Sequence, residues 1–311
     1  MGKTAFLFPG QGSQAVGMGR TAFDEHPWAR ECFEEADERL GFSLSRLCFE
    51  GPEDQLRLTA NAQPAILTTS FALFRLVEKN GLKPDFVAGH SLGEYTALAA
   101  SGVISFADAV QTVRQRGLFM EEAVPAGQGT MAAVIGADRE TVDRVCREVS
   151  EELGVVEPAN YNCPGQLVIS GEADAVKAAG EKMMTAGARR VISLSVSGPF
   201  HSSLMKPAAD RMEDVLGQLD MRDAAVPIVT NVFARPEWVA DKLRHALVEQ
   251  ISSPVLWEDS VRRMVDEGVD TFVEIGPGNV LTGLIRKIQR GVTAVSVRDE
   301  ESLRNLLEKM G

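Results

Sequence analysis

Residues 86–93 read Phe-Val-Ala-Gly-His-Ser-Leu-Gly, a short apolar run that ends in glycine and precedes the helix-forming residues 94–100. The segment 89–93 fits the G-x-S-x-G elbow, a sharp turn between a strand and a helix that exposes the serine hydroxyl. Glycine is needed on both sides because a side chain there would collide with the neighbouring helix or strand. The stretch therefore predicts strand, turn and helix, with Ser91 as the candidate nucleophile. A serine that merely caps the helix is the alternative.

Two other apolar runs end in glycine-rich turns in the same way. Residues 4–8 precede the turn 10–14, and residues 271–275 precede the turn 276–279, with a helix-like stretch expected after each. Alternation of short strand patterns with longer helical ones is typical of an α/β fold. In open α/β sheets, ligands gather at the carboxyl ends of the strands, so these turns fall where chemistry is expected.

Between residues 126 and 197 the pattern changes. Strand-like segments at 130–135, 155–160, 166–170 and 190–196 alternate with helix-like segments at 139–151 and 173–186. The β-α-β-β-α-β order is that of a ferredoxin-like unit. We therefore expect an α/β-hydrolase-like large domain with a parallel sheet, formed by residues 1–125 and 198–311. A ferredoxin-like small subdomain, residues 126–197, is inserted into it.

Composition limits the class of protein. The 311 residues are 44% hydrophobic and 24% charged, as in an ordinary globular protein. A net charge of −12 opposes binding to nucleic acid, which needs a basic face. No stretch approaches the roughly 18 apolar residues of a membrane span, and the opening residues show no signal peptide, so a soluble cytoplasmic protein is expected. The scattered cysteines lack the spacing of metal or redox sites and are expected to be reduced and mostly buried: Cys32, Cys48, Cys146 and Cys163.

A serine hydroxyl is a weak nucleophile and needs a base, for which histidine is the usual residue. The chain has four histidines. His26 and His245 lie in charged, helix-like surroundings typical of a surface. His90 would point to the opposite side of an extended strand from the nucleophile. His201, in a loop after the last strand of the small subdomain, is the best candidate, with a helix-capping histidine as the alternative.

Seven blocks of sequence, taken together, point to a known family. They are FPGQGSQ (8–14), GHSLGEY (89–95), QRG (115–117), NYNCPGQ (160–166), GPFH (198–201), Gln250 with SPV (253–255), and EIGPG (274–278). In this order, and over nearly the whole chain, the set resembles the malonyl-CoA:acyl carrier protein transacylases of fatty acid synthesis. Cys163 is a departure, since the family would have a small residue such as serine there.

The resemblance implies how the catalytic groups are arranged. Ser91 and His201 would form a dyad in which a main-chain carbonyl near Gln250, rather than an aspartate, orients the histidine. No aspartate or glutamate between Ser91 and His201 occupies an obvious triad position after a strand, which agrees with this implication. The amides of Gln11 and Leu92 would form the oxyanion hole, and the Leu92 amide is also expected at a helix N-terminus.

A malonyl group carries a second carboxylate, which a guanidinium holds by two parallel hydrogen bonds. In the helical stretch 106–120, Arg116 falls at the edge of the apolar stripe. There it could face a pocket, pair with a glutamate or keep its charged end in water. The family match assigns Arg116 to the malonyl carboxylate. Met120, on the same stripe, is expected at the substrate, and Phe200 resembles the bulky residue that leaves no room for a 2-methyl branch.

The implied reaction transfers malonyl from coenzyme A to the phosphopantetheine thiol of acyl carrier protein through a malonyl-Ser91 intermediate, without a metal or bound cofactor. A serine esterase or thioesterase with the same chemistry is the main alternative, and a non-catalytic carrier-binding module is the third possible function.

Residues 10–15 also fit the dinucleotide pattern G-x-G-x-x-A. That pattern needs an acidic residue at the end of a second strand, whereas residues 31–40 are helical in pattern.

Docking of the carrier protein would bring two acidic proteins together. Acyl carrier proteins of this type are generally acidic, as this chain is, so docking would need a local basic patch. Arg189 with Arg190, and Arg286, Lys287 and Arg290, are the candidate clusters. A solvated helical face is the alternative for each cluster.

Overall fold

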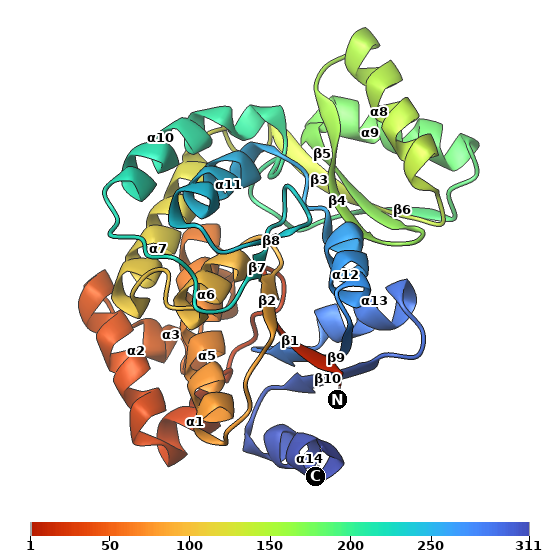
Figure 1. Cartoon of the computed structure of the whole chain (residues 1–311). Coiled ribbons are helices and arrows are strands. Elements are labelled where there is room, and N and C mark those ends of the chain that lie inside the picture. Colours follow the sequence, from red (N-terminus) through yellow and green to blue (C-terminus); the bar gives the residue numbers. More distant parts are fainter. Residues whose placement is uncertain (1, 311) are drawn as a thin grey trace.

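The larger part of the molecule is built on a six-stranded, mainly parallel sheet (Figure 1). The computed structural model describes residues 2–310. The strand order is β10-β9-β1-β2-β7-β8, and only the edge strand β8 runs antiparallel to its neighbour. The strands are β1 (Lys3–Phe8), β2 (Phe86–Gly89), β7 (Ile228–Val229), β8 (Pro236–Glu237), β9 (Val269–Ile275) and β10 (Thr293–Val297). The predicted α/β fold with a parallel sheet is confirmed.

Helices cover both faces of this sheet. In β1, Phe6 and Phe8 point into one core cluster, whereas Ala5 and Leu7 point into the other. A strand buried on both faces is apolar throughout, which is why residues 4–8 lack the alternation of a half-exposed strand. One face is covered by α12 (Trp257–Asp266) and α13 (Val280–Ile288). The other is covered by α1 (Arg20–Glu25), α2 (Pro27–Leu40), α3 (Leu44–Glu50), α4 (Glu53–Arg57), α5 (Thr59–Lys79), α6 (Gly93–Ala100), α7 (Phe106–Glu122), α10 (Lys206–Gly217), α11 (Ala240–Ser252) and α14 (Glu300–Met310).

A second, four-stranded sheet forms the smaller part, seen at the upper right of Figure 1. Its order is β4-β5-β3-β6 with every pair antiparallel, and two helices cover one of its faces. The elements are β3 (Gly129–Ile135), α8 (Arg139–Glu152), β4 (Val156–Cys163), β5 (Gln166–Glu172), α9 (Ala173–Thr185) and β6 (Arg190–Ser193). This arrangement confirms the ferredoxin-like small subdomain. Its boundaries at 126 and 197 stay a prediction.

One local prediction was wrong in its extent. The strand predicted over 190–196 ends at Ser193, because the chain must leave the edge of β3 there to reach the loop that carries His201. The helix expected after the turn 10–14 begins at Arg20, and the intervening residues form a series of turns. In contrast, residues 31–40 lie within α2, as their pattern predicted. A dinucleotide site would need a strand there that ends in an acidic residue, and these residues form none.

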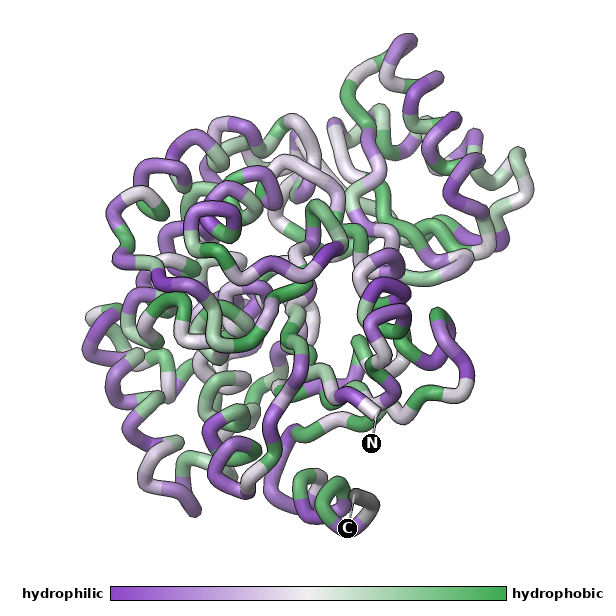
Figure 2. The backbone as a smooth tube through the Cα atoms, viewed as in Figure 1, coloured by the Kyte–Doolittle hydropathy of each residue, from purple (hydrophilic) through white to green (hydrophobic). Residues whose placement is uncertain are grey.

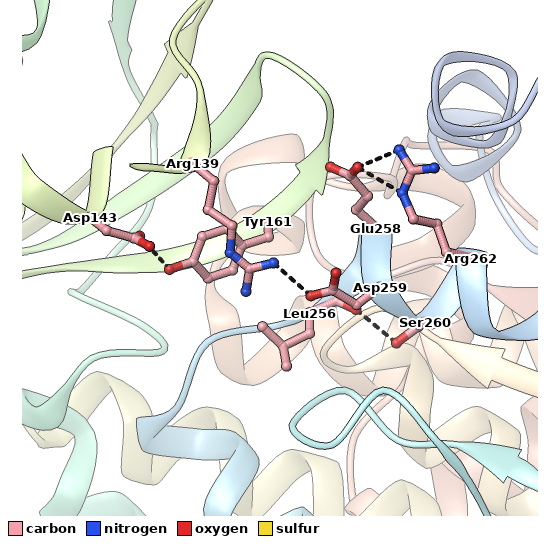
Figure 3. A network of polar contacts seen from close by, with 8 residues as sticks. All are labelled: Arg139, Asp143, Tyr161, Leu256, Glu258, Asp259, Ser260 and Arg262. Atoms are coloured by element: carbon pink, nitrogen blue, oxygen red, sulfur yellow. Dashed lines mark hydrogen bonds and ion pairs between the residues drawn. The ribbon is translucent and has the colours of Figure 1, made fainter. Parts of the chain in front are cut away.

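The small subdomain is joined to the large part through β4 and the segment before α12. The backbone of Val255 donates to Ala159 and accepts from Tyr161, which extends the small sheet by an isolated bridge. Beside it, the Arg139 guanidinium lies 3.9 Å from the centre of the Tyr161 ring and binds Asp259 on α12 at 2.9 Å (Figure 3). Such cation–π contacts contribute about 0.5–2 kcal/mol, so this contact supports the junction.

Hydropathy follows this layered arrangement. In Figure 2 the strands β1, β2 and β3 are mainly hydrophobic, whereas α8 on the outside of the small subdomain alternates hydrophilic residues with the apolar ones that it buries. Across residues 2–310, no helix combines the length and the apolar character that a bilayer crossing demands.

All four cysteines are buried and free, as predicted, and burial raises the pKa of the Cys32 thiol to about 11.

Candidate active site

The nucleophile elbow lies between β2 and α6, at the carboxyl edge of the large sheet. Ser91 has a φ of 52°, in the left-handed region that non-glycine residues rarely adopt. A Cβ atom on Gly89 would lie 1.9 Å from the backbone of Gly93, and one on Gly93 would lie 2.1 Å from the Phe8 carbonyl oxygen. The turn can therefore close only with glycine at both positions, as the sequence predicted.

Ser91 faces His201 across the site. The serine Oγ lies 2.7 Å from His201 Nε2, and His201 Nδ1 lies 2.9 Å from the main-chain oxygen of Gln250. Because a carbonyl oxygen only accepts hydrogen bonds, Nδ1 carries the proton and Nε2 is left free to accept from the serine hydroxyl. His201 sits between β6 and the short 3-10 helix η1 (Ser203–Met205), where its own φ is 58°.

The protonation state of His201 follows from its surroundings. Burial lowers its pKa to about 3, and the positive charge of Arg116 acts in the same direction. The imidazole is therefore neutral at pH 7, which is the form that accepts a proton.

Arg116 is buried beside the serine and histidine, with only 1% of its surface exposed. It lies deeper than the edge of the apolar stripe where helical spacing placed it. One terminal nitrogen donates to Gln63 Oε1 at 2.8 Å, and the other donates to Gln250 Oε1 at 2.9 Å and to Ser91 Oγ at 3.1 Å. Among the described residues no carboxylate accepts a hydrogen bond from this guanidinium, and its Nε has no partner. The charge is held by amide oxygens, and Glu94, which accepts from Gln250, acts on it only through space.

These groups line a pocket of about 380 Å³ at the junction of the two subdomains. The large part contributes Gln11, Leu92, Arg116, Met120, Phe200 and His201 beside Ser91, and the small subdomain contributes Met131, Asn160, Leu194, Ser195 and Val196. Within residues 2–310, neither the Gln11 amide nor the Leu92 amide donates a hydrogen bond to another protein group. Seven of the eight residues predicted for the site line this pocket, and the eighth, Gln250, lies behind Arg116.

The other histidines are placed differently. His90 Nε2 lies 2.8 Å from Asn162 Oδ1, and its ring packs against Trp257, so it supports the elbow from behind. His245 is exposed and stacks on Phe233. His26 belongs to the only group of three possible metal ligands found in the described part of the chain, with Glu25 and Glu300, and none of the three lines the pocket.

Sequence reasoning missed three buried polar residues of the site, which are Gln63, Glu94 and Asn231. Glu94 Oε2 accepts from Gln250 Nε2 at 2.8 Å and from the Asn231 amide at 3.2 Å. Burial raises the pKa of Glu94 to about 7. Glu94 could have been found, because it belongs to the sequence block around the nucleophile. For Gln63 the only indication was a polar residue in an otherwise apolar helix. Asn231 follows a strand of only two residues, too short for a recognisable pattern.

An α/β fold whose nucleophile elbow faces a buried histidine defines the class of enzymes that form a covalent intermediate on serine. The chain matches the acyl transferase domain family over residues 5–304. It is 52% identical over 303 residues to the malonyl CoA-acyl carrier protein transacylase of Bacillus subtilis (strain 168), covering 97% of this chain and 96% of the relative. With the protein of the same name from Staphylococcus aureus (strain MW2) the identity is 45%, covering 98% of each chain.

Solved structures agree with these relatives. A malonyl-transacylase in complex with a type II PKS acyl-carrier protein superposes with a TM-score of 0.96 at 44% identity, covering 99% of each chain. An acyl carrier protein S-malonyltransferase from Vibrio cholerae gives 0.95 at 43% identity, covering 98% of this chain and 99% of the other. The chain belongs to the acyl transferase family, and within it to the malonyl CoA-acyl carrier protein transacylases.

Proposed function

We propose that this chain transfers a malonyl group from malonyl-CoA to the phosphopantetheine thiol of an acyl carrier protein through a malonyl ester on Ser91. The observation that carries the proposal is the contact of Ser91 Oγ with both His201 Nε2 and the guanidinium of Arg116. A nucleophile, its base and a buried cation that bonds to no carboxylate of the described chain thus meet at one atom. The names of the matched relatives support the acyl group and the acceptor, and they do not favour the esterase alternative.

The reaction proceeds in two half-reactions. In the first, Ser91 Oγ attacks the thioester carbonyl while its proton passes to His201 Nε2. The tetrahedral intermediate collapses, the C–S bond breaks, and the coenzyme A sulfur leaves as a thiol with the proton from His201. In the second, His201 takes the proton of the carrier thiol, the sulfur attacks the ester, and Ser91 Oγ regains the proton. Each half uses His201 first as base and then as acid, and needs no bound cofactor.

The oxyanion of each tetrahedral intermediate requires donors that are not already used. The amides of Gln11 and Leu92 meet this requirement, since both residues line the pocket and neither amide is bonded within the described chain. Loss of one such donor costs about 100- to 1,000-fold in rate in well-studied hydrolases. We assign the two amides to this role.

The remaining pocket residues act on the malonyl group itself. Arg116 would bind its free carboxylate, because a fixed, buried guanidinium offers paired donors to a planar anion. Met120 accepts a weak hydrogen bond from Gln63 and lies on the same helix as Arg116. Met120 and Phe200 supply the apolar wall of the pocket and limit the space beside the acyl chain.

A basic surface near the pocket would receive the carrier protein. Arg190 on β6 and Gln166 on β5 both pair with Ile135 on β3, and Lys287 on α13 donates to Gln166 at 2.9 Å. One residue from each basic cluster named from sequence, Arg190 and Lys287, therefore lies at one end of the small sheet. Leu194, which lines the pocket, lies four residues beyond Arg190, about 13 Å along an extended chain. We assign docking to the surface formed by Arg190 and Lys287.

Product analysis tests the proposed reaction. The purified chain is mixed with malonyl-CoA and a carrier protein bearing phosphopantetheine, and the intact mass of the carrier is followed with time. We expect malonyl-carrier to appear in step with free coenzyme A, and neither to appear with Ser91→Ala. Free malonate formed in place of malonyl-carrier would contradict transfer and favour a hydrolase.

A further inference from the structure

The nucleophile elbow holds a strained backbone that needs external support. A non-glycine residue in the left-handed region costs about 1–2 kcal/mol, and such a conformation persists only where the surroundings impose it. Ser91 adopts it, with a φ of 52°. The glycines at 89 and 93 make room for the turn, but space alone does not select one conformation. Some other group must fix the peptides on either side of Ser91.

Asn231 is that group, because it lies beside the elbow and hydrogen-bonds to the backbone on the strand side of Ser91. Parallel pairing of β7 with β2 aligns Ala88 with Val229, so the residue two places further on comes level with the elbow. The Asn231 side chain accepts from the Ser91 amide at 2.7 Å and donates to the Gly89 carbonyl at 2.7 Å. One planar amide thus joins the last residue of the strand to the nucleophile.

The orientation of this amide is determined by its partners. The Ser91 N–H can only donate and the Gly89 carbonyl can only accept, so Asn231 Oδ1 must face the first and Nδ2 the second. Its backbone is held in turn, because the Asn231 N–H donates to Glu94 Oε2 at 3.2 Å. The residue is fully buried, so water does not compete for these bonds.

Gln250 completes the support from the other side. Its Nε2 donates to the Ser91 carbonyl at 2.9 Å and to Glu94 Oε2 at 2.8 Å, while its own main-chain oxygen orients His201. Glu94 therefore receives hydrogen bonds from both residues that hold Ser91. Any shift of Asn231 would be transmitted to the serine amide and to the adjoining Leu92 amide.

We propose that Asn231 is a positioning residue for acyl transfer, whose side-chain amide holds Ser91 in the conformation that places its hydroxyl on His201 and the next amide toward the oxyanion. The proposal rests on the proposed function, since it concerns the rate at which Ser91 takes up malonyl. Asn231 touches neither the acyl group nor the base. Its effect is on geometry, and a misplacement of about 1 Å costs on the order of 100-fold in rate.

Single-turnover acylation by malonyl-CoA tests this role in Asn231→Ala. The dependence of the rate on malonyl-CoA concentration separates the maximal rate from apparent binding. We expect the maximal rate to fall about 100-fold, with the apparent Kd unchanged within about 3-fold. Val229→Ala, two residues away and also buried, is the matched control for lost packing, and its acylation rate per folded molecule should equal that of the wild type.

Asn231→Asp provides a second variant of the same size and adds a pH readout. An ionised aspartate cannot donate to the Gly89 carbonyl, whereas a protonated one reproduces the donor and acceptor of the amide. The charged or titratable groups around it are Glu94 on α6, Arg116 on α7 and His201, and His201 stays neutral well below pH 7. We expect slow acylation at pH 8 and recovery of at least 10-fold relative to the wild type at pH 5.5.

Three outcomes would overturn the role of Asn231. They are wild-type acylation by Asn231→Ala, equal losses in Asn231→Ala and Val229→Ala, and a rate ratio of Asn231→Asp to wild type that does not change with pH. Absence of malonyl-Ser91 on the wild-type chain is a different result. It would contradict the proposed function itself, and the role of Asn231 with it.

Discussion

Arg116 keeps its charge at a position that is almost fully buried, among amide oxygens and one hydroxyl. Burying a charge without an opposite charge is costly, and proteins accept that cost mainly at functional sites. Gln63 and Gln250 hold the guanidinium in a fixed orientation, no carboxylate among the described residues bonds to it, and Glu94 acts on it only through space. A substrate carboxylate would complete the site, which is why the pocket should select a malonyl over an acetyl group.

Truncation of Arg116 tests this selectivity. Two charge-assisted hydrogen bonds contribute about 3 kcal/mol in all, so Arg116→Ala should lower kcat/KM for malonyl-CoA by at least 100-fold. The residual rate with acetyl-CoA should change far less. Arg114→Ala is the control, because Arg114 lies on the same helix but binds Asn61 outside the pocket. Equal losses with malonyl-CoA and acetyl-CoA would show that Arg116 does not read the carboxylate.

Glu94 makes the stability of the molecule depend on pH. Its pKa is raised by burial from 4.5 to about 7, so between these values the folded chain binds more protons than the unfolded chain. The stabilising contribution is present below pH 4.5 and is lost as the pH rises through 7. Relative to Glu94→Gln, the wild type should lose about 3 kcal/mol of unfolding free energy between pH 4.5 and pH 8. Urea unfolding at both pH values measures this difference, and a difference independent of pH would contradict a buried titrating carboxyl.

At the scale of elements, the strand, elbow and helix from Phe86 to Ala100 were predictable because each part has a strong local signal. The apolar run, the two glycines and the helix formers all indicate the same structure. The short strands β7 and β8 had no such signal, since two residues cannot show a period. Asn231 was missed for that reason. Its position depends on pairing with β2, which is a tertiary interaction.

The site itself was predictable in part. The motif blocks supplied Ser91, His201 and Arg116, and they placed the histidine's partner near Gln250. They could not show that the main-chain oxygen is that of Gln250 itself, or that its side chain reaches Ser91 and Glu94. Those contacts depend on how the last turn of α11 brings Gln250 to the elbow and to Glu94 on α6. The early end of β6 was missed because Leu194 and Val196 continue the apolar alternation after the strand has left the sheet.

We predict that the carrier protein docks on the surface formed by Arg190 of β6 and Lys287 of α13. Arg190→Glu combined with Lys287→Glu should raise KM for the carrier protein about 10-fold and leave acylation by malonyl-CoA unchanged. The effect should shrink at high salt, since both residues are exposed. Arg147→Glu with Lys177→Glu makes the same change of charge on the outer helices α8 and α9. A similar rise in KM for this control pair would show that net charge, not the assigned surface, controls docking.

For the molecule as a whole, the active site is assembled from segments distant in sequence. The proposed nucleophile Ser91 follows β2, the proposed base His201 lies in the loop after the small subdomain, and Gln250 comes from α11. The small subdomain closes the pocket, and its junction with the large part runs through Val255 and the Arg139 contacts of Figure 3. A net charge of −12 leaves this chain acidic overall, so attraction to an acidic carrier must be local.

Trapping the ester shows whether malonyl is carried on Ser91 Oγ. The protein is mixed with labelled malonyl-CoA without acceptor, quenched in acid and analysed by intact-protein and peptide mass spectrometry. The control for Ser91→Ala is Ser101→Ala, which changes a buried serine at the C-terminal end of α6, the helix that follows Ser91. We predict one malonyl group per chain on the peptide containing Ser91, lost in Ser91→Ala, kept in Ser101→Ala and discharged when carrier protein is added. Label on another residue, or label that persists in Ser91→Ala, would contradict the account.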